Sequence, residues 1–375
     1  MKELEGLIRE ELKANGTFLL GVTPVEPATG AKAYLRWLEN RNHAGMHFLE
    51  KNIDCRLNPA KILKGSSSII SFALPYGQGD SLVKRGSFEG RIAQYGRLRD
   101  YHREMKKIGE RVGRAIQSYC LDRGMKSPLF RVTVDSAPVL EREIAVKTIG
   151  FIGKNTCYIH PQWGSFLLLG EIFTTFDWRQ DRSNKGNKNS KNDKELMVSK
   201  DGISRRVSSD RPCGSCKRCA VFCPTGALDT AYQLDANRCL SYWTIEHRGL
   251  IPVRFWNRIA DYYFGCDICQ IVCPFNRDRP KLSRTDLIRL DRNIDAEKVV
   301  MMTQEDYEKW FGGTPLTRAR IHGLKRNALI SLIVQKNNQL DRLITKLSSE
   351  PEVHQILIGT IKQIPEFNTY LNDHH

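Results

Sequence analysis

The order of apolar and polar residues predicts alternating helices and strands over the first half of the chain. Apolar residues recur at helical spacing from Leu4 to Leu12, and Gly16 is placed to end that helix. The same patterns predict further helices at 32–39 and 100–119, and strands at 18–22, 68–74, 130–134 and 165–176. Because strands alternate with helices, we expect an α/β domain over residues 1–178.

The second half of the chain has two different patterns. Residues 179–211 contain polar, basic stretches such as Ser183–Asn192, which have almost nothing to bury. We interpret 179–211 as a flexible, solvated loop rather than a specific binding arm. After residue 280 the pattern is helical: a capping box at Thr303–Asp306 opens one helix, and others are predicted at 321–333, 340–347 and 353–364. Short helices joined by brief loops indicate a helical-repeat domain over 281–375.

Cysteines between these two regions carry the strongest chemical signal in the sequence. The run from Cys213 to Pro224 has the C-x₂-C-x₂-C-x₃-C-P spacing of bacterial ferredoxins. The run from Cys266 to Pro274 has only the last three cysteines of that pattern. Cys239 brings the total to eight thiols, which is enough for two four-iron clusters. Residues 212–280 are therefore predicted to form a ferredoxin-like domain.

The spacing also predicts how the ligands are shared. In two-cluster ferredoxins the cysteine before the proline ligates the other cluster. We therefore expect a first cysteine set of Cys213, Cys216, Cys219 and Cys273. The second cysteine set is then Cys223, Cys239, Cys266 and Cys269. Two zinc sites or a set of disulfides are the alternatives, but this run is not a usual zinc pattern. The scattered Cys55, Cys120 and Cys157 are better explained as small buried side chains.

Composition narrows the class of protein and of partner. The chain has 375 residues, 41% hydrophobic and 27% charged, as in ordinary soluble proteins. No apolar run reaches the ~18 residues of a membrane span, and the first ten residues resemble an amphipathic helix rather than a signal peptide. We expect a reducing cytoplasm, where thiols stay free. The net charge of +16 suits a polyanionic partner, although charge alone does not separate RNA from DNA or an acidic protein.

Motifs spread over the chain resemble those of epoxyqueuosine reductases, corrinoid enzymes of tRNA queuosine synthesis. They follow the family's order and are Tyr95–His102, Val134–Pro138, Gly153–Asn155, Gly164–Ser165, Gly170–Glu171, Cys239–Glu246, Gly265–Cys269, Cys273–Asn276 and Gly323–Asn327. The departures are the loop 179–211 and the residues Gly96 and Leu98. Asp100 and His102 begin a D-x-H-x-x-G corrinoid motif, but Met105 stands where glycine is needed.

The resemblance implies three domains and two kinds of cofactor. The α/β domain would bind cob(II)alamin, the ferredoxin-like domain two [4Fe-4S] clusters, and a HEAT-like tail would help to hold tRNA. Cobalt would have no protein ligand. The implied cobalamin contacts are Arg56, Tyr95, Asp135, Gly153, Lys154, Asn155, Ser165, Gly170, Ser241, Gly265 and Asp267.

The implied reaction reduces epoxyqueuosine to queuosine at the wobble position of tRNA with a GUN anticodon, for aspartate, asparagine, histidine or tyrosine. A flavodoxin or ferredoxin-type donor would supply electrons to a monomeric enzyme. Asp135 is the implied acid, because an alkoxide is a poor leaving group. A carboxylic acid that stays protonated near neutral pH needs burial or apolar neighbours. On its spacing alone, Asp135 would be a carboxylate that caps a turn.

The tRNA backbone is expected at the junction of the three domains. The expected contacts are His247, Arg248, Arg318, Arg320, Lys325 and Arg326, with Asn327 as a polar contact. Any one of these side chains could instead belong to a solvated helix face. Two other functions stay open: a corrinoid reductive dehalogenase, which usually carries a twin-arginine signal, and a non-enzymatic iron–sulfur protein that binds RNA or carries electrons. A corrinoid spectrum after anaerobic reconstitution would separate the enzymes from the last class.

Overall fold

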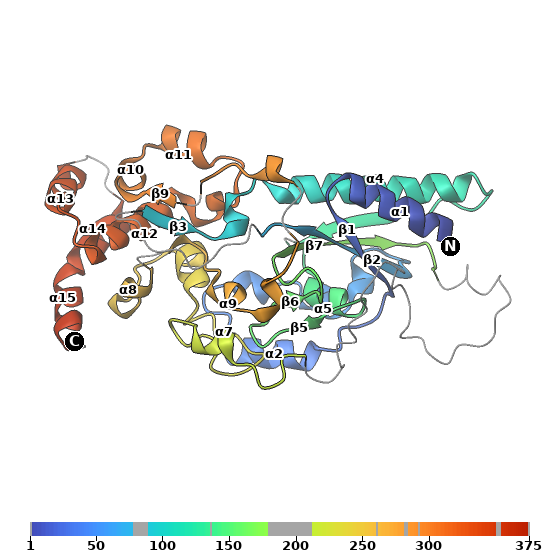
Figure 1. Cartoon of the computed structure of the whole chain (residues 1–375), viewed down its shortest axis with the longest axis horizontal. Coiled ribbons are helices and arrows are strands. Elements are labelled where there is room, and N and C mark those ends of the chain that lie inside the picture. Colours follow the sequence, from blue (N-terminus) through green and yellow to red (C-terminus); the bar gives the residue numbers. More distant parts are fainter. Residues whose placement is uncertain are drawn as a thin grey trace.

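The computed structural model describes residues 2–77, 89–135, 137–178, 212–259, 262–280, 284–291, 293–349 and 354–373. The predicted loop at 179–211 lies outside these residues. Figure 1 shows the N-terminal sheet with its helices at one end of the molecule and helices α13 to α15 at the other. The cysteine-rich segments lie between them. Among the described helices, none is long and apolar enough to cross a membrane.

Within the described residues, four strands form the main sheet in the order β1-β2-β7-β4. Their bounds are Phe18–Pro24 for β1, Ser68–Pro75 for β2, Phe130–Val134 for β4 and Leu167–Thr174 for β7. The four predicted strands are confirmed, and every neighbouring pair is antiparallel. All eight residues of β2 are buried, so this strand is covered on both faces.

Successive side chains of β2 enter two different cores, as the two-residue period of a strand requires. Ile70, Phe72 and Leu74 pack with α1 (Lys2–Ala14) and α4 (Tyr101–Leu121) on one face. Ile69 and Ala73 face the other side, where α5 (Glu141–Val146) packs. The short helices α2 (Ala31–Glu39) and α3 (Ile53–Leu57) precede β2. The two helical layers are visible above and below the sheet in Figure 1.

Helix α4 lies unusually close to β4, and this places the start of the helix beside the end of the strand. A Cβ on Gly109 would meet Val132 at 2.6 Å, and one on Gly113 would meet the Phe130 ring at 2.5 Å. Glycine at both positions therefore permits the close approach. The helix begins at Tyr101 and β4 ends at Val134, so residues 100–102 lie next to Asp135.

Short strands tie the three parts of the chain together. Strand β3 (Glu89–Ile92) pairs parallel with β8 (Tyr262–Phe264) and antiparallel with β9 (Asn293–Asp295). The hairpin strands β5 (Phe151–Ile152) and β6 (Tyr158–Ile159) pair with each other. None of these strands was predicted, because two to four residues give too short a pattern and the pairing of β3 with β8 and β9 is long-range.

The tail is helical as predicted. Its helices are α10 (Ala296–Met301), α11 (Gln304–Phe311), α12 (Arg320–Val334), α13 (Leu340–Ser349), α14 (Gln355–Lys362) and α15 (Ile364–Asp373). Thr303 and Asp306 form both halves of the predicted capping box. Leu329 and Leu332 of α12 belong to one apolar core with Trp256 and Phe264, which come from the cysteine-rich region and its helix α8 (Trp256–Ile259). The tail and that region are thus packed into a common core.

Candidate functional site

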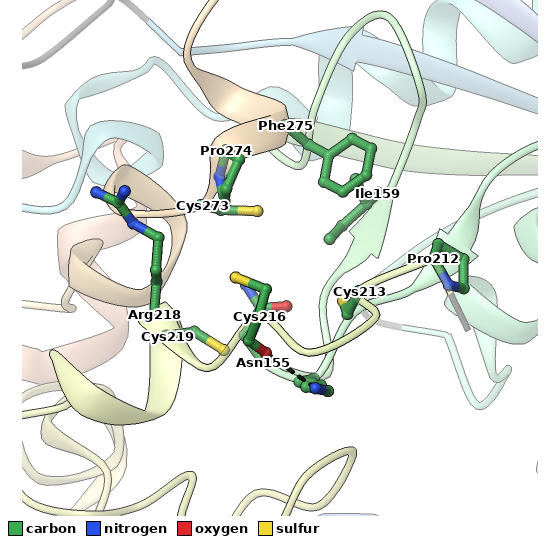
Figure 2. Close-up of a pocket in the computed structure, with 11 residues that line it drawn as sticks. Asn155, Ile159, Pro212, Cys213, Cys216, Arg218, Cys219, Cys273, Pro274 and Phe275 are labelled. Carbon is green, nitrogen blue, oxygen red and sulfur yellow. Dashed lines mark hydrogen bonds between the residues drawn. The ribbon is translucent and has the colours of Figure 1, made fainter. Parts of the chain in front are cut away.

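The first cysteine set lines one pocket of about 230 Å³. Figure 2 shows the side chains of Cys216, Cys219 and Cys273 converging on the same space, with Cys213 at its edge. The short helices α7 (Arg218–Val221) and α9 (Ile268–Ile271), which pack against each other, hold the two cysteine runs together. Cys273 thus joins the three cysteines of the other run, which is the grouping that the spacing predicts.

The second cysteine set is also gathered in space. Burial raises the pKa of Cys266, and the nearby thiols of Cys239 and Cys223 add to the rise. Burial likewise raises the pKa of Cys239, with Cys223 again among its neighbours. Cys266 and Cys239 in turn lie close to Cys269. Four thiols held this closely suit a bound cation or metal cluster, because their thiolates would repel one another without it.

The segment Gly153–Asn155 fixes both cysteine runs. Lys154 Nζ donates hydrogen bonds to the backbone oxygens of Gly214 at 2.7 Å and Cys216 at 2.9 Å. Asn155 Nδ2 donates to the backbone oxygen of Cys269 at 3.3 Å. These residues were expected to contact cobalamin, and in the structure their side chains hold the cluster loops. Ser241, expected in the same role, has its hydroxyl against the Cys239 thiol.

Cys157 is a residue near the cluster loops that sequence reasoning missed. Its thiol shares a hydrogen bond with Cys269, which is the first cause of a lowered pKa for Cys157, to about 7, and of a raised pKa for Cys269. The Cys157 N–H also donates to Asn155 Oδ1 at 3.3 Å. The position of Cys157, two residues after a family motif, was the available signal.

Asp135 lies in a hydrogen-bonded network at the end of β4. Tyr101 donates its hydroxyl to Asp135 Oδ2 at 2.5 Å, and His102 Nε2 lies 2.6 Å from Asp135 Oδ1. His102 Nδ1 lies 3.0 Å from Asp100 Oδ1, and Asp100 also accepts from the His102 backbone N–H as the N-cap of α4. His102 therefore bridges two carboxylates.

The environment of Asp135 differs from the expected one. Its side chain is 38% exposed, so burial, one of the two expected ways to keep an acid protonated, is not found at this residue. The hydroxyl and imidazole that contact it both favour a carboxylate. Raised pKa values are found instead at neighbouring groups. The pKa of His102 is raised, first of all by its hydrogen bond to Asp135. Burial raises the pKa of Glu141 to about 7. Burial also raises the pKa of Glu171 well above its usual range.

Tyr95 and Asp267 connect this network with the second cysteine set. Asp267 lies between Cys266 and Cys269 in the sequence and is buried. Its side chain accepts a hydrogen bond from the Gln94 backbone N–H at 2.7 Å. Burial raises the pKa of Tyr95, and the nearby Asp267 and Asp135 add to the rise. Asp267 also lies near Cys266. Tyr95 therefore has two kinds of neighbour: Asp267 from the second cysteine set's loop, and Asp135 from the acid network, by which we mean Asp100, Tyr101, His102 and Asp135.

The other expected cofactor contacts have structural partners. Gly170 is buried in the sheet, where a Cβ would meet the Phe72 ring at 2.6 Å, so its lack of a side chain serves packing rather than a cofactor contact. Ser165 Oγ donates to Gln270 Oε1 at 2.9 Å. Gly265 has φ +72° and donates its N–H to Thr244 Oγ1 at 3.0 Å. Arg56 donates to the backbone oxygens of Lys51 and Phe48.

Arg326 corrects the expected tRNA contacts. It is fully buried, and its guanidinium donates to the backbone oxygens of Trp243, His247 and Gly249 at 2.6–3.0 Å. Burial lowers the pKa of Arg326 to about 9. A side chain committed to three carbonyls inside the protein does not reach a phosphate. Asn327 is buried as well and donates to the backbone oxygens of Thr244 and Tyr263.

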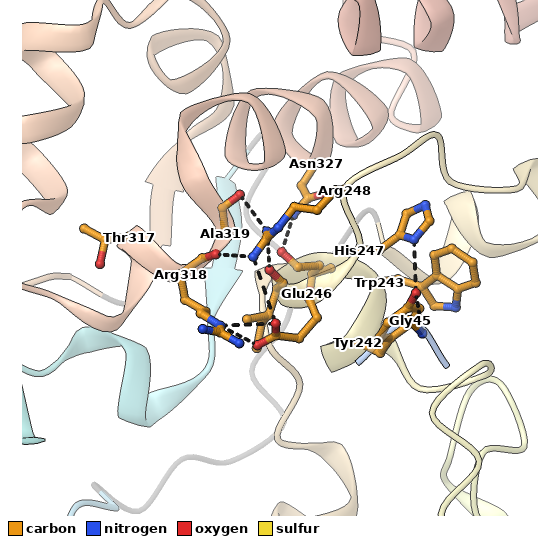
Figure 3. Close-up of polar contacts among 12 residues, drawn as sticks. Gly45, Tyr242, Trp243, Glu246, His247, Arg248, Thr317, Arg318, Ala319 and Asn327 are labelled. Carbon is orange, nitrogen blue, oxygen red and sulfur yellow. Dashed lines mark hydrogen bonds and ion pairs between the residues drawn. The ribbon is translucent and has the colours of Figure 1, made fainter. Parts of the chain in front are cut away.

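Two more of the expected contacts serve the junction between the tail and the cysteine-rich region (Figure 3). Arg248 donates to the backbone oxygens of Arg318 at 2.7 Å and Ala319 at 3.3 Å. His247 uses both ring nitrogens, with Tyr242 Oη at 3.2 Å and the backbone oxygen of Leu250 at 2.9 Å. His247 is half-buried at this junction, and Arg248 is exposed.

Arg318 and Arg320 are exposed, and Lys325 is half-buried. Arg318 Nε donates to both carboxylate oxygens of Glu246, at 2.8 and 3.1 Å, and its guanidinium lies 5.1 Å from the centre of the exposed Phe48 ring. The pKa of Arg318 is raised, by this hydrogen bond first and further by Asp135 and Tyr95. The Arg318 side chain therefore lies near the acid network.

A separate group of His43, His47 and Glu50 gathers three metal-binding side chains. His43 Nε2 lies 2.7 Å from Glu50 Oε1, and His47 Nδ1 lies 3.4 Å from Glu50 Oε2. Hydrogen bonding of one carboxylate by two imidazoles accounts for this geometry without an ion.

Comparisons with known proteins agree with the site. Residues 212–276 match the family model of a 4Fe-4S double cluster binding domain. Residues 56–136 match the model described as Epoxyqueuosine reductase QueG, DUF1730. The two matched segments contain all eight cysteines of the two sets and the Tyr101–His102–Asp135 network.

Full-length relatives extend these matches over most of the chain. The epoxyqueuosine reductase of Pseudomonas aeruginosa is 32% identical over 320 residues, which cover 84% of this chain and 80% of that protein. The epoxyqueuosine reductase of Cyclobacterium marinum is 32% identical over 295 residues, covering 78% of this chain and 84% of that protein.

Solved structures agree in fold. The epoxyqueuosine reductase of Streptococcus thermophilus superposes with a TM-score of 0.71 at 25% identity, covering 93% of this chain and 86% of that one. An epoxyqueuosine reductase crystallised with an epoxyqueuosine-modified stem loop of tyrosine tRNA gives a TM-score of 0.78 at 22% identity, covering 97% and 89%. With these lengths of shared sequence and this shared fold, the chain belongs to the epoxyqueuosine reductase family.

Proposed function

We propose that this chain reduces epoxyqueuosine to queuosine in tRNA, with electrons delivered through two [4Fe-4S] clusters and a proton delivered by Asp135. The observation that carries the proposal is the proximity of the acid network to the loop of the second cysteine set, since Tyr95 has both Asp135 and Asp267 as neighbours. A reductive opening of an epoxide needs an electron source and an acid on the same substrate. This arrangement brings the two together.

Each cysteine set would hold one four-iron cluster. The second set lies nearer to Asp135, through Asp267, so electrons would enter at the first set and leave from the second. Four-iron clusters reach potentials down to about −700 mV, which suits a strongly reducing reaction. A flavodoxin or ferredoxin-type protein would supply the electrons, and the enzyme would act as a monomer.

Cobalamin is the second cofactor that we propose, and the network around His102 bears on its fit. Both ring nitrogens of His102 are engaged by carboxylates, so this imidazole is not free to ligate cobalt. Met105 stands where a corrinoid motif has glycine, and it is fully buried in the apolar core between α4 and the sheet. Tyr95 and Asp135 would line the corrinoid site, with His102 holding Asp135 rather than the cofactor. When bound, it would supply a strongly reducing metal centre for the epoxide.

Asp135 would protonate the departing oxygen, and its two partners fix its orientation. Tyr101 and His102 fix both carboxyl oxygens, so the side chain has a defined orientation. The 38% of its surface that is exposed leaves it open to substrate. Proton transfer by a positioned acid contributes about 10²–10⁴-fold to a rate.

The tRNA would bind at the exposed junction beside this network. The wobble base lies in a single-stranded loop, where unstacking costs least. Arg318 lies near Asp135 and over the exposed Phe48 ring, and planar groups of this kind stack unpaired bases. With the chain's net charge of +16, Arg318 and Arg320 suit the phosphates of an anticodon loop. We expect a preference for tRNAs with a GUN anticodon.

Anaerobic reconstitution followed by single-turnover assay tests the proposal. The protein loaded with iron, sulfide and cobalamin should bind about eight irons and show a corrinoid spectrum. It should convert an epoxyqueuosine-containing stem loop when reduced. Asp135→Asn should keep its iron content and stem-loop affinity, and its turnover should be at least about 10²-fold slower.

Removal of one ligand provides a further check on the clusters. Cys239→Ala should lose about half of the iron, since it would break only the second cluster. A wild-type protein with about four irons, or one that reduces the stem loop without any corrinoid, would refute the corresponding part of the proposal.

A further inference from the structure

The proton balance of the reaction requires more than one acid. Reduction of a neutral epoxide to a neutral product takes up two electrons and two protons, whether the oxygen leaves as water or stays as an alcohol. The proposed clusters supply the electrons. Asp135 holds one proton at most and must be protonated again within each turnover. The inference of a second proton source rests on the role proposed for Asp135.

His102 is the titratable group in direct contact with Asp135 that can carry this proton. Its Nε2 lies 2.6 Å from Asp135 Oδ1, a distance suited to direct transfer. Its other nitrogen lies 3.0 Å from Asp100, whose charge stabilises an imidazolium. His102 itself is 39% exposed, so solvent can restore its proton. Tyr101 holds the second oxygen of Asp135 and keeps the first one directed at His102.

The two carboxylates that contact the imidazole favour a proton on it, whereas the nearby arginines oppose one. On α4, Asp100 contacts His102, and Arg103 Nε lies 3.5 Å from Asp100. From α5, the carboxyl of Glu141 favours an imidazolium and the guanidinium of Arg142 opposes it. Glu171 of β7 also lies nearby, and burial raises the pKa of its carboxyl. Arg318 approaches from the tail. The pKa of His102 is raised, by the hydrogen bond to Asp135 first and with help from Asp100.

We propose that His102 is the proton source of Asp135. As Asp135 gives its proton to the substrate oxygen, the Nε2–H bond of His102 breaks and an O–H bond forms on Asp135. His102 is left neutral and takes a proton from solvent. Two passages through this pair supply the two protons of one reduction. Asp100 assists by stabilising the imidazolium, and His102 acts through Asp135 without touching the substrate.

A purely orienting role for His102 predicts different behaviour, so variants can separate the two. His102→Gln keeps a hydrogen-bond donor near Asp135 but carries no exchangeable charge. Asp100→Asn keeps a good helix N-cap but removes the charge behind the imidazole. Asp122→Asn, at the other end of the same helix, is the matched control because it changes the same charge far from the pair. Single-turnover rates on the stem loop are measured against pH, with protein pre-reduced so that electron supply is constant.

The wild-type rate should fall about tenfold per pH unit above the pKa of His102. Asp100→Asn should move this fall to lower pH, whereas Asp122→Asn should leave it in place. His102→Gln should lose the dependence and react at least about tenfold more slowly. In His102→Ala, added imidazole should restore part of the rate. Iron content and stem-loop affinity should stay at wild-type values in each variant.

Three results would overturn the inference. The first is a wild-type rate and pH profile in His102→Gln. The second is an unshifted profile in Asp100→Asn, which decides the matter even if His102→Gln does not load iron. The third is wild-type turnover by Asp135→Asn, which would remove the acid through which His102 acts and would refute the role proposed for Asp135 as well. If Asp135→Asn turns over slowly but the His102 variants keep the wild-type rate and pH profile, the relay is refuted and the role proposed for Asp135 stands.

Discussion

Arg326 donates a hydrogen bond to the backbone oxygen of Trp243 at 2.8 Å from a fully buried position. The same guanidinium holds the backbone oxygens of His247 and Gly249. Trp243 belongs to the turn Tyr242–Glu246, and Arg326 belongs to α12, so this residue fastens the tail to the cysteine-rich region. The expected phosphate contact is thus a structural link.

Replacing Arg326 should destabilise the fold rather than change RNA binding alone. Arg326→Gln takes the donor from at least two of these part-buried carbonyls, and each loss costs up to about 1–3 kcal/mol. The melting temperature should fall by several degrees, as measured by circular dichroism under anaerobic conditions. Arg320→Gln, an exposed position six residues earlier, should stay within about 0.5 kcal/mol. Equal melting of the two variants would contradict the structural role.

The error at Arg326 shows where sequence reasoning stops. Local spacing predicted α12 correctly, because the apolar run around Leu329 identifies a helix by itself. Nothing local distinguishes Arg326 from Lys325, since burial depends on which loop packs against the helix. That loop, at Trp243–Gly249, lies 77–83 residues away in the chain. Tertiary contact, not helix pattern, decides between a phosphate ligand and a buried link.

The cysteine sets were predictable for the opposite reason. The spacing of the cysteines determines the loop that holds a cluster, and the cysteine before each proline is expected to ligate the cluster of the other run. The partners of Asp135 were not predictable in detail. Tyr101 and His102 lie in a recognised motif, but their contact with Asp135 depends on Gly109 and Gly113, which let α4 approach β4. The exposure of Asp135 was not predictable either, because it depends on which side chains pack around the end of β4.

Cys157 should tune the second cluster. Once Cys269 ligates iron as a thiolate, the Cys157 thiol would be the donor of the hydrogen bond that they share, and hydrogen bonds to the sulfurs raise cluster potentials. Cys157→Ala should therefore make one of the two potentials more negative and leave the other in place. A redox titration followed by electron paramagnetic resonance measures both. Cys120→Ala, at a buried position in α4, is the control. Two unshifted potentials in Cys157→Ala would show that the contact is lost once iron is bound.

Basic residues at the junction should contribute to tRNA binding through phosphate contacts. Each such contact adds about 0.7–0.9 to the magnitude of the slope of log affinity against log salt. Arg320→Gln and Lys325→Gln should each weaken binding of an anticodon stem loop and reduce that slope by about this amount. Fluorescence anisotropy between low and physiological salt gives both quantities. Lys126→Gln, exposed beyond the far end of α4, is the matched control and should change neither. An unchanged slope in both junction variants would exclude this surface as the phosphate site.

Glu141 should make stability depend on pH beneath the acid network. Burial is the main cause of its raised pKa, from 4.5 to about 7, with Asp135 adding to the rise and Arg142 opposing it. The folded protein therefore keeps this proton between pH 4.5 and about 7, whereas the unfolded chain releases it. Its contribution to stability is complete below pH 4.5 and is lost as pH rises to about 7, at up to about 1.4 kcal/mol per pH unit.

Glu141→Gln removes this titration and keeps the shape of the side chain. The difference in melting temperature between the variant and the wild type should grow in favour of the variant from pH 5 to pH 7 and level off above. Groups that do not interact with Glu141 titrate alike in both proteins and so cancel in the difference. Glu366→Gln, on exposed α15, should show no such trend. A difference that stays constant from pH 5 to pH 7 would mean that Glu141 is already ionised in the fold, and that Asp135 faces a second negative charge.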